Sequence, residues 1–199
     1  GGVTGLTGLV ENNSIWLGVE PASTSTAEYN TALGATAMDA ITTGDYNTAV
    51  GYAAGGALTD SVTNAFFGAY AGETYNHADG NNTLIGYGAG RSRTGGSQNV
   101  AVGTSAGRNS TSSNSDVMVG FQAGFNVHGG SNVMLGAQAG QGVGTTDTTN
   151  AVFIGKYAGY NRAASSATDV GNIFIGRDAG YHPTGGYNVF VGYNAGKGS

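Results

Sequence analysis

Histidine and aspartate are the residues of this sequence that could perform acid–base chemistry or hold a metal ion. The three histidines, His77, His128 and His182, all lie in segments between repeated motifs. None stands at helical spacing from another histidine, and the chain has no cysteine that could share a metal with them. We therefore expect all three to be solvated loop residues, and we expect neither a thiolate metal site nor a disulfide framework.

Carboxylates that could bind Ca²⁺ are spread along the chain. The candidates lie in separate turns and are Asp45, Asp79, Asp147 and Asp169. Ca²⁺ takes six to eight oxygen ligands that converge on one point, so isolated turn aspartates are weak candidates. The calcium-binding nonapeptide pattern GGxGxD does not occur. A Ca²⁺ clip stays open as an alternative, but we expect no metal.

Two glycine-rich stretches have a superficial likeness to nucleotide-binding loops. In "GYNAGKGS" (192–199), a phosphate loop would need glycine where Val191 stands and Ser or Thr after Lys197, where Gly198 stands. "GYGAG" (86–90) lacks the third glycine of a dinucleotide fingerprint and opens no helix. No Ser, His and Asp set clusters by sequence either. We expect no catalytic or cofactor-binding residues, so an enzyme ranks last among the functions considered.

Aromatic and polar side chains could instead hold a surface glycan. One set recurs directly after a repeated glycine, and the other lies in or beside later turns: Tyr52, Tyr87, Tyr193; Tyr160, Arg162, Tyr181, His182. A repeated tyrosine is more often a stacked structural ladder than a binding site. The receptor-binding residues are therefore left unknown.

Composition excludes several classes of protein. The 199 residues include 38 glycines, only 10% are charged, and the net charge is −5. Because a nucleic-acid binder needs a basic face, we expect no nucleic-acid partner. No apolar run approaches the roughly 18 residues that span a bilayer, so we expect no membrane insertion. The chain has neither an initiator Met nor a signal peptide, and we read it as a mature product or a fragment.

A nine-residue motif recurs through the chain. "NTAVGYAAG" (47–55) returns as "NTLIGYGAG" (82–90), "NVAVGTSAG" (99–107) and "NVFVGYNAG" (188–196). We call the glycine after each hydrophobic triplet the anchor glycine; the set is Gly34, Gly51, Gly68, Gly86, Gly103, Gly120, Gly136, Gly155, Gly176 and Gly192. A period of roughly 17 residues is too short for helical repeats or propeller blades. It predicts an all-β, repetitive β-solenoid of about ten coils, in which each triplet is a short strand and a second, weaker strand follows in each coil.

The direction of the side chains follows from strand alternation. The residue before each anchor glycine is always large and apolar, which predicts that this column lines the interior: Leu33, Val50, Phe67, Ile85, Val102, Val119, Leu135, Ile154, Ile175, Val191. The column two before the glycine is also apolar and should then face outward: Ala32, Ala49, Phe66, Leu84, Ala101, Met118, Met134, Phe153, Phe174, Phe190. Either loops cover it or, as we favour, other copies of the chain pack there.

Two further columns predict specific contacts. Ala stands three residues after every anchor glycine, from Ala37 to Ala195, which indicates a tight corner. Asn stands four residues before most anchor glycines, and such amides can form a ladder between coils. Asp116 replaces the Asn once, and Ala151 replaces it once. The degenerate "NSIWLG" and Pro21 mark residues 1–28 as an N-terminal capping coil, with the β-solenoid repeat domain over residues 29–199.

"NNSIWLG", "YNTALGATAMDAITTGDYNTAVGYAAG" and the later copies resemble the repeats of tail-fibre proteins of tailed bacteriophages, particularly cyanophages and other marine phages. They are also similar to the head repeats of trimeric autotransporter adhesins, whose coil is shorter. The resemblance covers about residues 12–196; this chain departs from it in the long excursions "QGVGTTDTTN" and "YNRAASSATDVG". It implies a non-catalytic, homotrimeric fibre segment of a virion that extends toward and contacts the host surface, with a host glycan or protein as a possible partner. The alternative is a bacterial surface adhesin or a secreted filament, located outside the cell.

Overall fold

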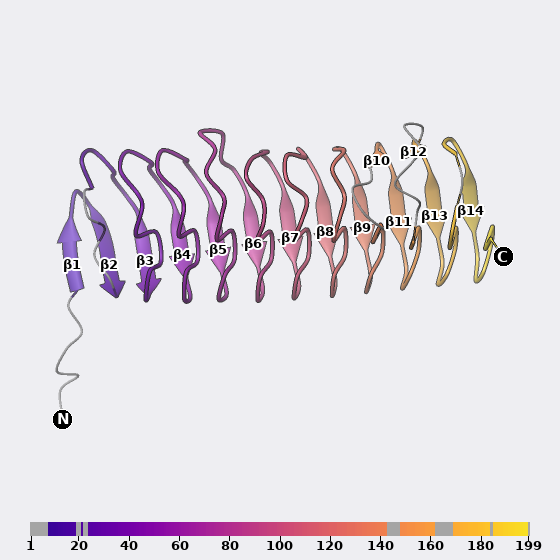
Figure 1. Ribbon diagram of the computed structural model, residues 1–199, viewed down its shortest axis with the longest axis horizontal. Helices are drawn as coiled ribbons and strands as arrows, with labels where there is room; N and C mark the ends of the chain where they lie inside the picture. The colour runs from indigo at the N-terminus through magenta and orange to yellow at the C-terminus, as the bar shows by residue number, and fades with distance from the viewer. Residues whose placement is uncertain are drawn as a thin grey trace, which may run out of the picture.

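The computed structural model is a straight β-solenoid rod, as the repeat predicts (Figure 1). The structure describes residues 8–18, 21, 24–142, 148–161, 169–183 and 185–198, and these contain no helix. No described segment is an apolar helix of the length that a membrane crossing requires. Strands β1 (Gly8–Glu11) and β14 (Val189–Val191) lie at opposite ends of the rod, and each coil adds one strand beside the last (Figure 1).

The main sheet has twelve strands in the order β1-β2-β3-β4-β5-β6-β7-β8-β9-β11-β13-β14. All neighbouring pairs are parallel except β1 with β2, which are antiparallel. The strands are short because the glycine after each triplet turns the chain, and their bounds are β1 Gly8–Glu11, β2 Ser14–Gly18, β3 Thr31–Gly34, β4 Thr48–Val50, β5 Ala65–Phe67, β6 Thr83–Ile85, β7 Val100–Val102, β8 Val117–Val119, β9 Val133–Leu135, β11 Val152–Ile154, β13 Ile173–Ile175 and β14 Val189–Val191.

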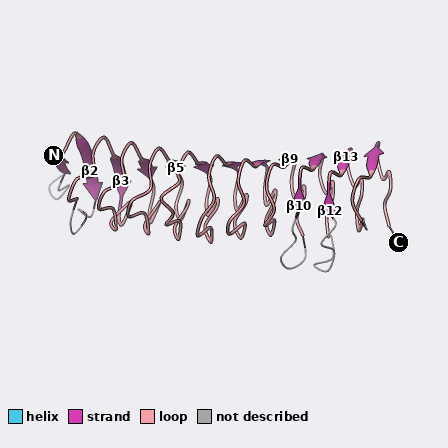
Figure 2. Cartoon of the chain, turned by 90° about the horizontal axis from the view of Figure 1, so that it is seen from above, coloured by secondary structure: helices cyan, strands magenta, loops and turns pink. Residues whose placement is uncertain are grey.

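Most coils have only one strand among the described residues. A second strand in a coil is rare. Only β10 (Thr148–Thr149) and β12 (Asp169–Val170) form one, and they pair with each other in parallel as a separate two-stranded sheet. The prediction of a second strand in every coil was therefore wrong. In the other coils, turns close the wall opposite the sheet, so that all strands of the main sheet lie on one side of the rod (Figure 2).

Pairing between coils joins equivalent residues of the motif. Phe66, for example, is opposite Leu84 in the next strand, and Phe67 is opposite Ile85. Each position of the motif therefore becomes a column that runs along the rod, and successive positions of a strand point to opposite faces of the sheet.

The predicted inner and outer columns are exchanged in the structure. The column two before the anchor glycine is the core: Phe66, Leu84 and Met118 are all 0% exposed. The column one before it faces outward, with Phe67 and Ile85 each 39% exposed. The inward assignment of Leu33, Val50, Phe67, Ile85, Val102, Val119, Leu135, Ile154, Ile175 and Val191 was therefore wrong, and so was the assignment of Phe153, Phe174 and Phe190 to partner contacts.

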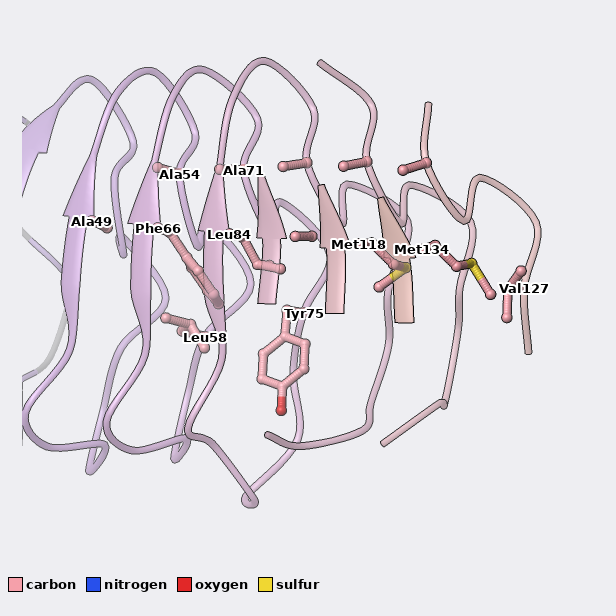
Figure 3. Close-up of a cluster of buried hydrophobic side chains, with 14 of the residues drawn as sticks. Ala49, Ala54, Leu58, Phe66, Ala71, Tyr75, Leu84, Met118, Val127 and Met134 are labelled. Carbon is pink, nitrogen blue, oxygen red and sulfur yellow. The ribbon is translucent and has the colours of Figure 1, made fainter. Parts of the chain in front are cut away.

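The core column contains side chains from alanine to phenylalanine, and side chains from the opposite wall fill the space that differs between coils. Leu58 and Tyr75 project from the turns toward Phe66 and Leu84 of the sheet (Figure 3). The rings of Phe66 and Tyr75 meet edge to face with centroids 5.9 Å apart. Packing of complementary sizes fills a core as well as uniform residues do, so uniform size was a misleading sign of burial.

The turn after each strand is tight, as the alanine column predicted. Ala37, Ala54, Ala71 and Ala89 are all 0% exposed. The anchor glycines stack directly on one another; a Cβ on Gly86 would come within 2.6 Å of the backbone oxygen of the next anchor glycine. Only glycine fits where two coils approach this closely.

The predicted asparagine ladder is present inside the rod. The Oδ1 of Asn30 accepts hydrogen bonds from the backbone N–H and the Nδ2 of Asn47, at 2.8 and 3.1 Å. Asn64 makes the same two bonds to Asn47, at 3.0 Å each. Ser14 begins the ladder, and at Ala151 only the backbone N–H takes part, donating to Asn132. The ladder satisfies buried backbone donors in every coil that it joins.

One coil carries charge in this interior. Arg93 occupies the wall position held by Tyr75 one coil earlier, and it is 0% exposed. Its guanidinium donates to the backbone oxygen of Ser113 at 2.6 Å, while burial lowers its pKa to about 10 and the charge of Asp116 opposes that shift. Asp116, the single aspartate of the ladder, is also 0% exposed, and burial raises its pKa. The aspartate at this one rung thus offsets the one buried arginine among the described residues.

Candidate functional site

The outward face of the main sheet is a surface of apolar and threonine side chains that runs along the whole rod. It combines two columns, at one and three residues before the anchor glycine. The exposed members of the first include Leu33 at 44%, Phe67 at 39%, Val119 at 37% and Val191 at 65%. In the second, Thr31, Thr48 and Thr83 give way to Val100, Val117, Val133, Val152, Ile173 and Val189 in later coils. We call these two columns the sheet face.

The sheet face has no role in closing the core, because the core is complete on the other side of the strands. The buried cluster contains residues from the inward column, the alanine corner and the opposite wall, and none from the sheet face. Contiguous apolar stripes of this kind are uncommon on isolated soluble proteins and mark interaction surfaces.

A second surface borders the sheet face where the strands end, along the lower edge of the rod in Figure 1. We call it the strand-end corner; it comprises the residues one, two and five positions after each anchor glycine. In the early coils it contains a tyrosine cluster: Tyr70 meets Tyr52 edge to face at 5.2 Å between centroids and Tyr87 at 5.6 Å. The predicted candidates Tyr52 and Tyr87 are therefore joined through a residue that the sequence analysis did not select.

In the late coils the corner carries another aromatic group. The rings of Tyr160 and Tyr181 stack with centroids 5.0 Å apart, and Tyr157 meets both of them edge to face. His182 lies edge-on to Tyr181 at 4.7 Å, and its Nδ1 is 2.8 Å from the Nδ2 of Asn161. Burial raises the pKa of the Tyr181 hydroxyl.

Cations of the corner lie over these tyrosine rings. The guanidinium carbon of Arg91 is 4.2 Å from the ring centre of Tyr70, and the Nζ of Lys156 is 4.8 Å from that of Tyr157. Farther along, the Nζ of Lys197 is 5.1 Å from the ring centre of Tyr181. Arg177 lies over Tyr193, at 5.9 Å. Such contacts stabilise a cation on a ring without neutralising its charge.

Charge along the rod is strongly polarised. All seven Lys and Arg residues follow residue 90, whereas eight of the twelve Asp and Glu residues precede it. Residues 1–90 thus carry a formal charge of −8, and residues 91–199 carry +3. Of the six described cations, Arg93 is buried, and the others all belong to the strand-end corner: Arg91, Arg108, Lys156, Arg177, Lys197.

Two of these cations have a carboxylate partner. The Nε of Arg91 donates to Glu73 of the previous coil, and this hydrogen bond raises the pKa of Arg91. The Nε of Arg177 lies 3.4 Å from Asp178. Within the described part of the chain, Arg108, Lys156 and Lys197 form no ion pair.

The remaining candidates do not converge. His77 lies 3.8 Å from Asp79, and the Nδ1 of His128 is 2.9 Å from the Thr111 hydroxyl. Asp45 accepts a hydrogen bond from the backbone N–H of Glu28. Among the described residues no group of three or more His, Cys, Asp or Glu could hold a metal ion. Asp147 and Arg162 lie outside the described residues, as does the side chain of Asp169.

The sequence analysis missed the basic members of the corner, although a signal was present. Arg91, Arg108 and Lys197 share one position of the repeat, five residues after an anchor glycine, and Lys156 and Arg177 share another. Reading the repeat by columns of charge, rather than by columns of apolar residues alone, would have found them.

We compared the chain with protein-family models, curated proteins and solved structures. No family model matches the chain, and no curated protein and no solved structure resembles it significantly.

Proposed function

We propose that this chain is a structural segment of a fibre, of the kind found in phage tail fibres, which self-associates laterally as a homotrimer and extends toward a host surface. The observation that carries this proposal is the sheet face, which has one column that is apolar along the whole rod and a second that becomes apolar from Val100 on, and which does not contribute to the chain's own core.

Burial of the sheet face between copies explains its residues. The solenoid closes its interior within one chain, so the outward valines, isoleucines and leucines need another reason to be apolar. Burying a side chain of this size contributes about 1.5–3 kcal/mol. The same positions recur in every coil, so a parallel arrangement of three rods would repeat each contact along the whole fibre. Closed symmetric assembly is the rule for soluble oligomers, and the trimer follows the resemblance to fibre repeats.

A rod also fits a task of reach rather than of catalysis. Each coil lengthens the rod by one strand spacing, about 4.8 Å, and presents side chains at the same positions as the coil before it. Among the described residues, no three histidine or acidic side chains converge on one point, and the aromatic and basic side chains gather on an outer corner. Contact with a surface is what such a corner can provide.

Sedimentation equilibrium tests the assembly. We expect the mass of three chains at micromolar concentration. The double substitution Ile85→Ser and Val119→Ser on the sheet face should raise the dissociation concentration at least tenfold, since each removes apolar area from the interface. The matched control is Tyr46→Ser, which removes an aromatic ring that is 58% exposed. Tyr46 precedes β4 and does not belong to either column of the sheet face. A wild-type monomer would overturn the proposal, and a clean dimer would retain lateral association but exclude the trimer.

A further inference from the structure

We infer that the basic half of the strand-end corner, from Arg91 to Lys197, is a binding site for an acidic polysaccharide. This inference deepens the proposed function, because it names the chemistry of the surface that the fibre contacts. It rests on that proposal only for the idea that the rod meets a cell surface, since the site itself lies within one chain.

The first argument is the placement of charge. This acidic protein has all five of its described surface cations at two positions of the repeat, so that they lie in two columns that run along the rod, with no cation in the two coils between Arg108 and Lys156. At about 4.8 Å per coil, the distance along the rod from Arg91 to Lys197 is roughly 30 Å. Arg108, Lys156 and Lys197 have no carboxylate partner among the described residues, and their charge is available to an anion.

The second argument is the interleaving of rings with these charges. Lys156, Arg177 and Lys197 each lie over a tyrosine of the same corner, which holds the cation beside an aromatic surface. Tyr193 is 68% exposed and Tyr87 is 50% exposed. The apolar C–H face of a sugar ring can pack on such a tyrosine while its carboxylate or sulfate pairs with the neighbouring cation.

The spacing and number of charges favour a polysaccharide over other anions. A nucleic acid presents one phosphate per nucleotide, and tight binding commonly uses six to ten phosphate contacts, whereas this corner offers three unpaired cations on a chain of net charge −5. A lipid surface is a plane, and the cations here lie along a single edge. The strand-end corner of a second chain offers these cations too few free carboxylates. Its acidic half contains only Asp39 and Glu73, and Glu73 already pairs with Arg91.

The test is calorimetric titration of the intact chain with polygalacturonate of defined length. The variant combines Arg108→Gln, Lys156→Gln and Lys197→Gln, and the matched variant combines Lys156→Arg and Lys197→Arg. We expect saturable binding by the wild type that weakens as salt is added, a loss on the order of a hundredfold in the Gln variant, and little change in the Arg variant. Asp39→Asn, in the acidic half of the corner, should leave affinity within about twofold.

Parallel titrations use neutral dextran, single-stranded DNA and phosphatidylglycerol vesicles, and wild-type binding to each should be weaker than to polygalacturonate. Equal or tighter binding of any of these three would overturn the inference, as would unchanged affinity in a folded Gln variant or no binding of polygalacturonate by the wild type. Sedimentation of the same samples separates the two proposals: a trimer that does not bind removes only the polysaccharide site, and a monomer that binds removes only the fibre assembly.

Discussion

Phe66 and Phe67 are adjacent in strand β5 and differ in which face of the sheet they occupy. Phe66 is 0% exposed and packs edge to face on Tyr75, while Phe67 is 39% exposed on the sheet face. Phe66→Ala should cost about 3–5 kcal/mol of local stability, because it loses the buried ring and leaves a cavity. Phe67→Ala removes a ring that is only partly buried and creates no enclosed cavity, so it should cost roughly 1–2 kcal/mol in the isolated chain.

Hydrogen exchange is the assay that fits a repeat protein, because stability in a solenoid is distributed over neighbouring coils and a single global value is poorly defined. Exchange of peptides spanning β4 to β6 should accelerate strongly in Phe66→Ala and modestly in Phe67→Ala, when both are measured below the concentration at which chains associate. At higher concentration only Phe67→Ala should weaken assembly with its coil intact. Equal acceleration, or a larger effect at Phe67, would refute the assignment of the core.

Other positions test the ladder, the anchor glycines and the buried charge. Asn82→Ala should lower the free energy of unfolding by about 1–3 kcal/mol, because it leaves buried hydrogen-bond donors and acceptors unpaired. Asn76→Ala, in an exposed loop, should be near neutral. Urea titration compares the two variants, and equal unfolding midpoints would contradict the stabilising role of the ladder. Gly86→Ala should lower the melting temperature sharply, because the new Cβ would lie 2.6 Å from a backbone oxygen of the next coil. Gly192→Ala should lower it less, because its Cβ would meet nothing within 4 Å and only the positive φ disfavours alanine there. Similar melting temperatures for the two variants would show that close approach of the coils is not the reason for glycine at the anchor position. Burial raises the pKa of Asp116 from its ordinary value of 3.8, so the folded state takes up a proton first as the pH falls. Thermal melts should therefore show the wild type gaining stability relative to Asp116→Asn as the pH falls from the folded-state pKa to 3.8, with no further gain below; a relative gain with rising pH would contradict this.

Several features of the rod followed from the sequence alone. The anchor glycines and their near-constant spacing specified parallel coils, because a period of roughly 17 residues suits one coil of a β-solenoid and is too short for a helical repeat or a propeller blade. The alanine that follows each anchor specified a corner with no room for a larger side chain, and the structure has Ala54 and Ala71 fully buried. The repeated asparagine specified a ladder, since an amide that stacks on its own copy can both donate and accept.

The facing of the two apolar columns was decided only by tertiary structure. Strand alternation says that Phe66 and Phe67 face opposite ways, but a shift of one residue exchanges the two faces of the whole sheet, and both columns are apolar. A deciding clue was present: Asn64 lies two residues before Phe66, on the same face, and a buried ladder therefore places Phe66 inside.

The strand-end corner also depended on the tertiary structure, for a different reason. Contacts such as Arg91 over Tyr70 or Lys197 over Tyr181 join different coils, and the first of them also joins different positions of the motif. Their geometry is set by the turn after each anchor glycine, where Tyr70 and Tyr157 adopt positive φ angles of 61° and 62°. Non-glycine residues rarely adopt this conformation on local preference, so stacking of the coils imposes it. The sequence determined which residues recur at each coil, and the winding of the chain determined which of them meet.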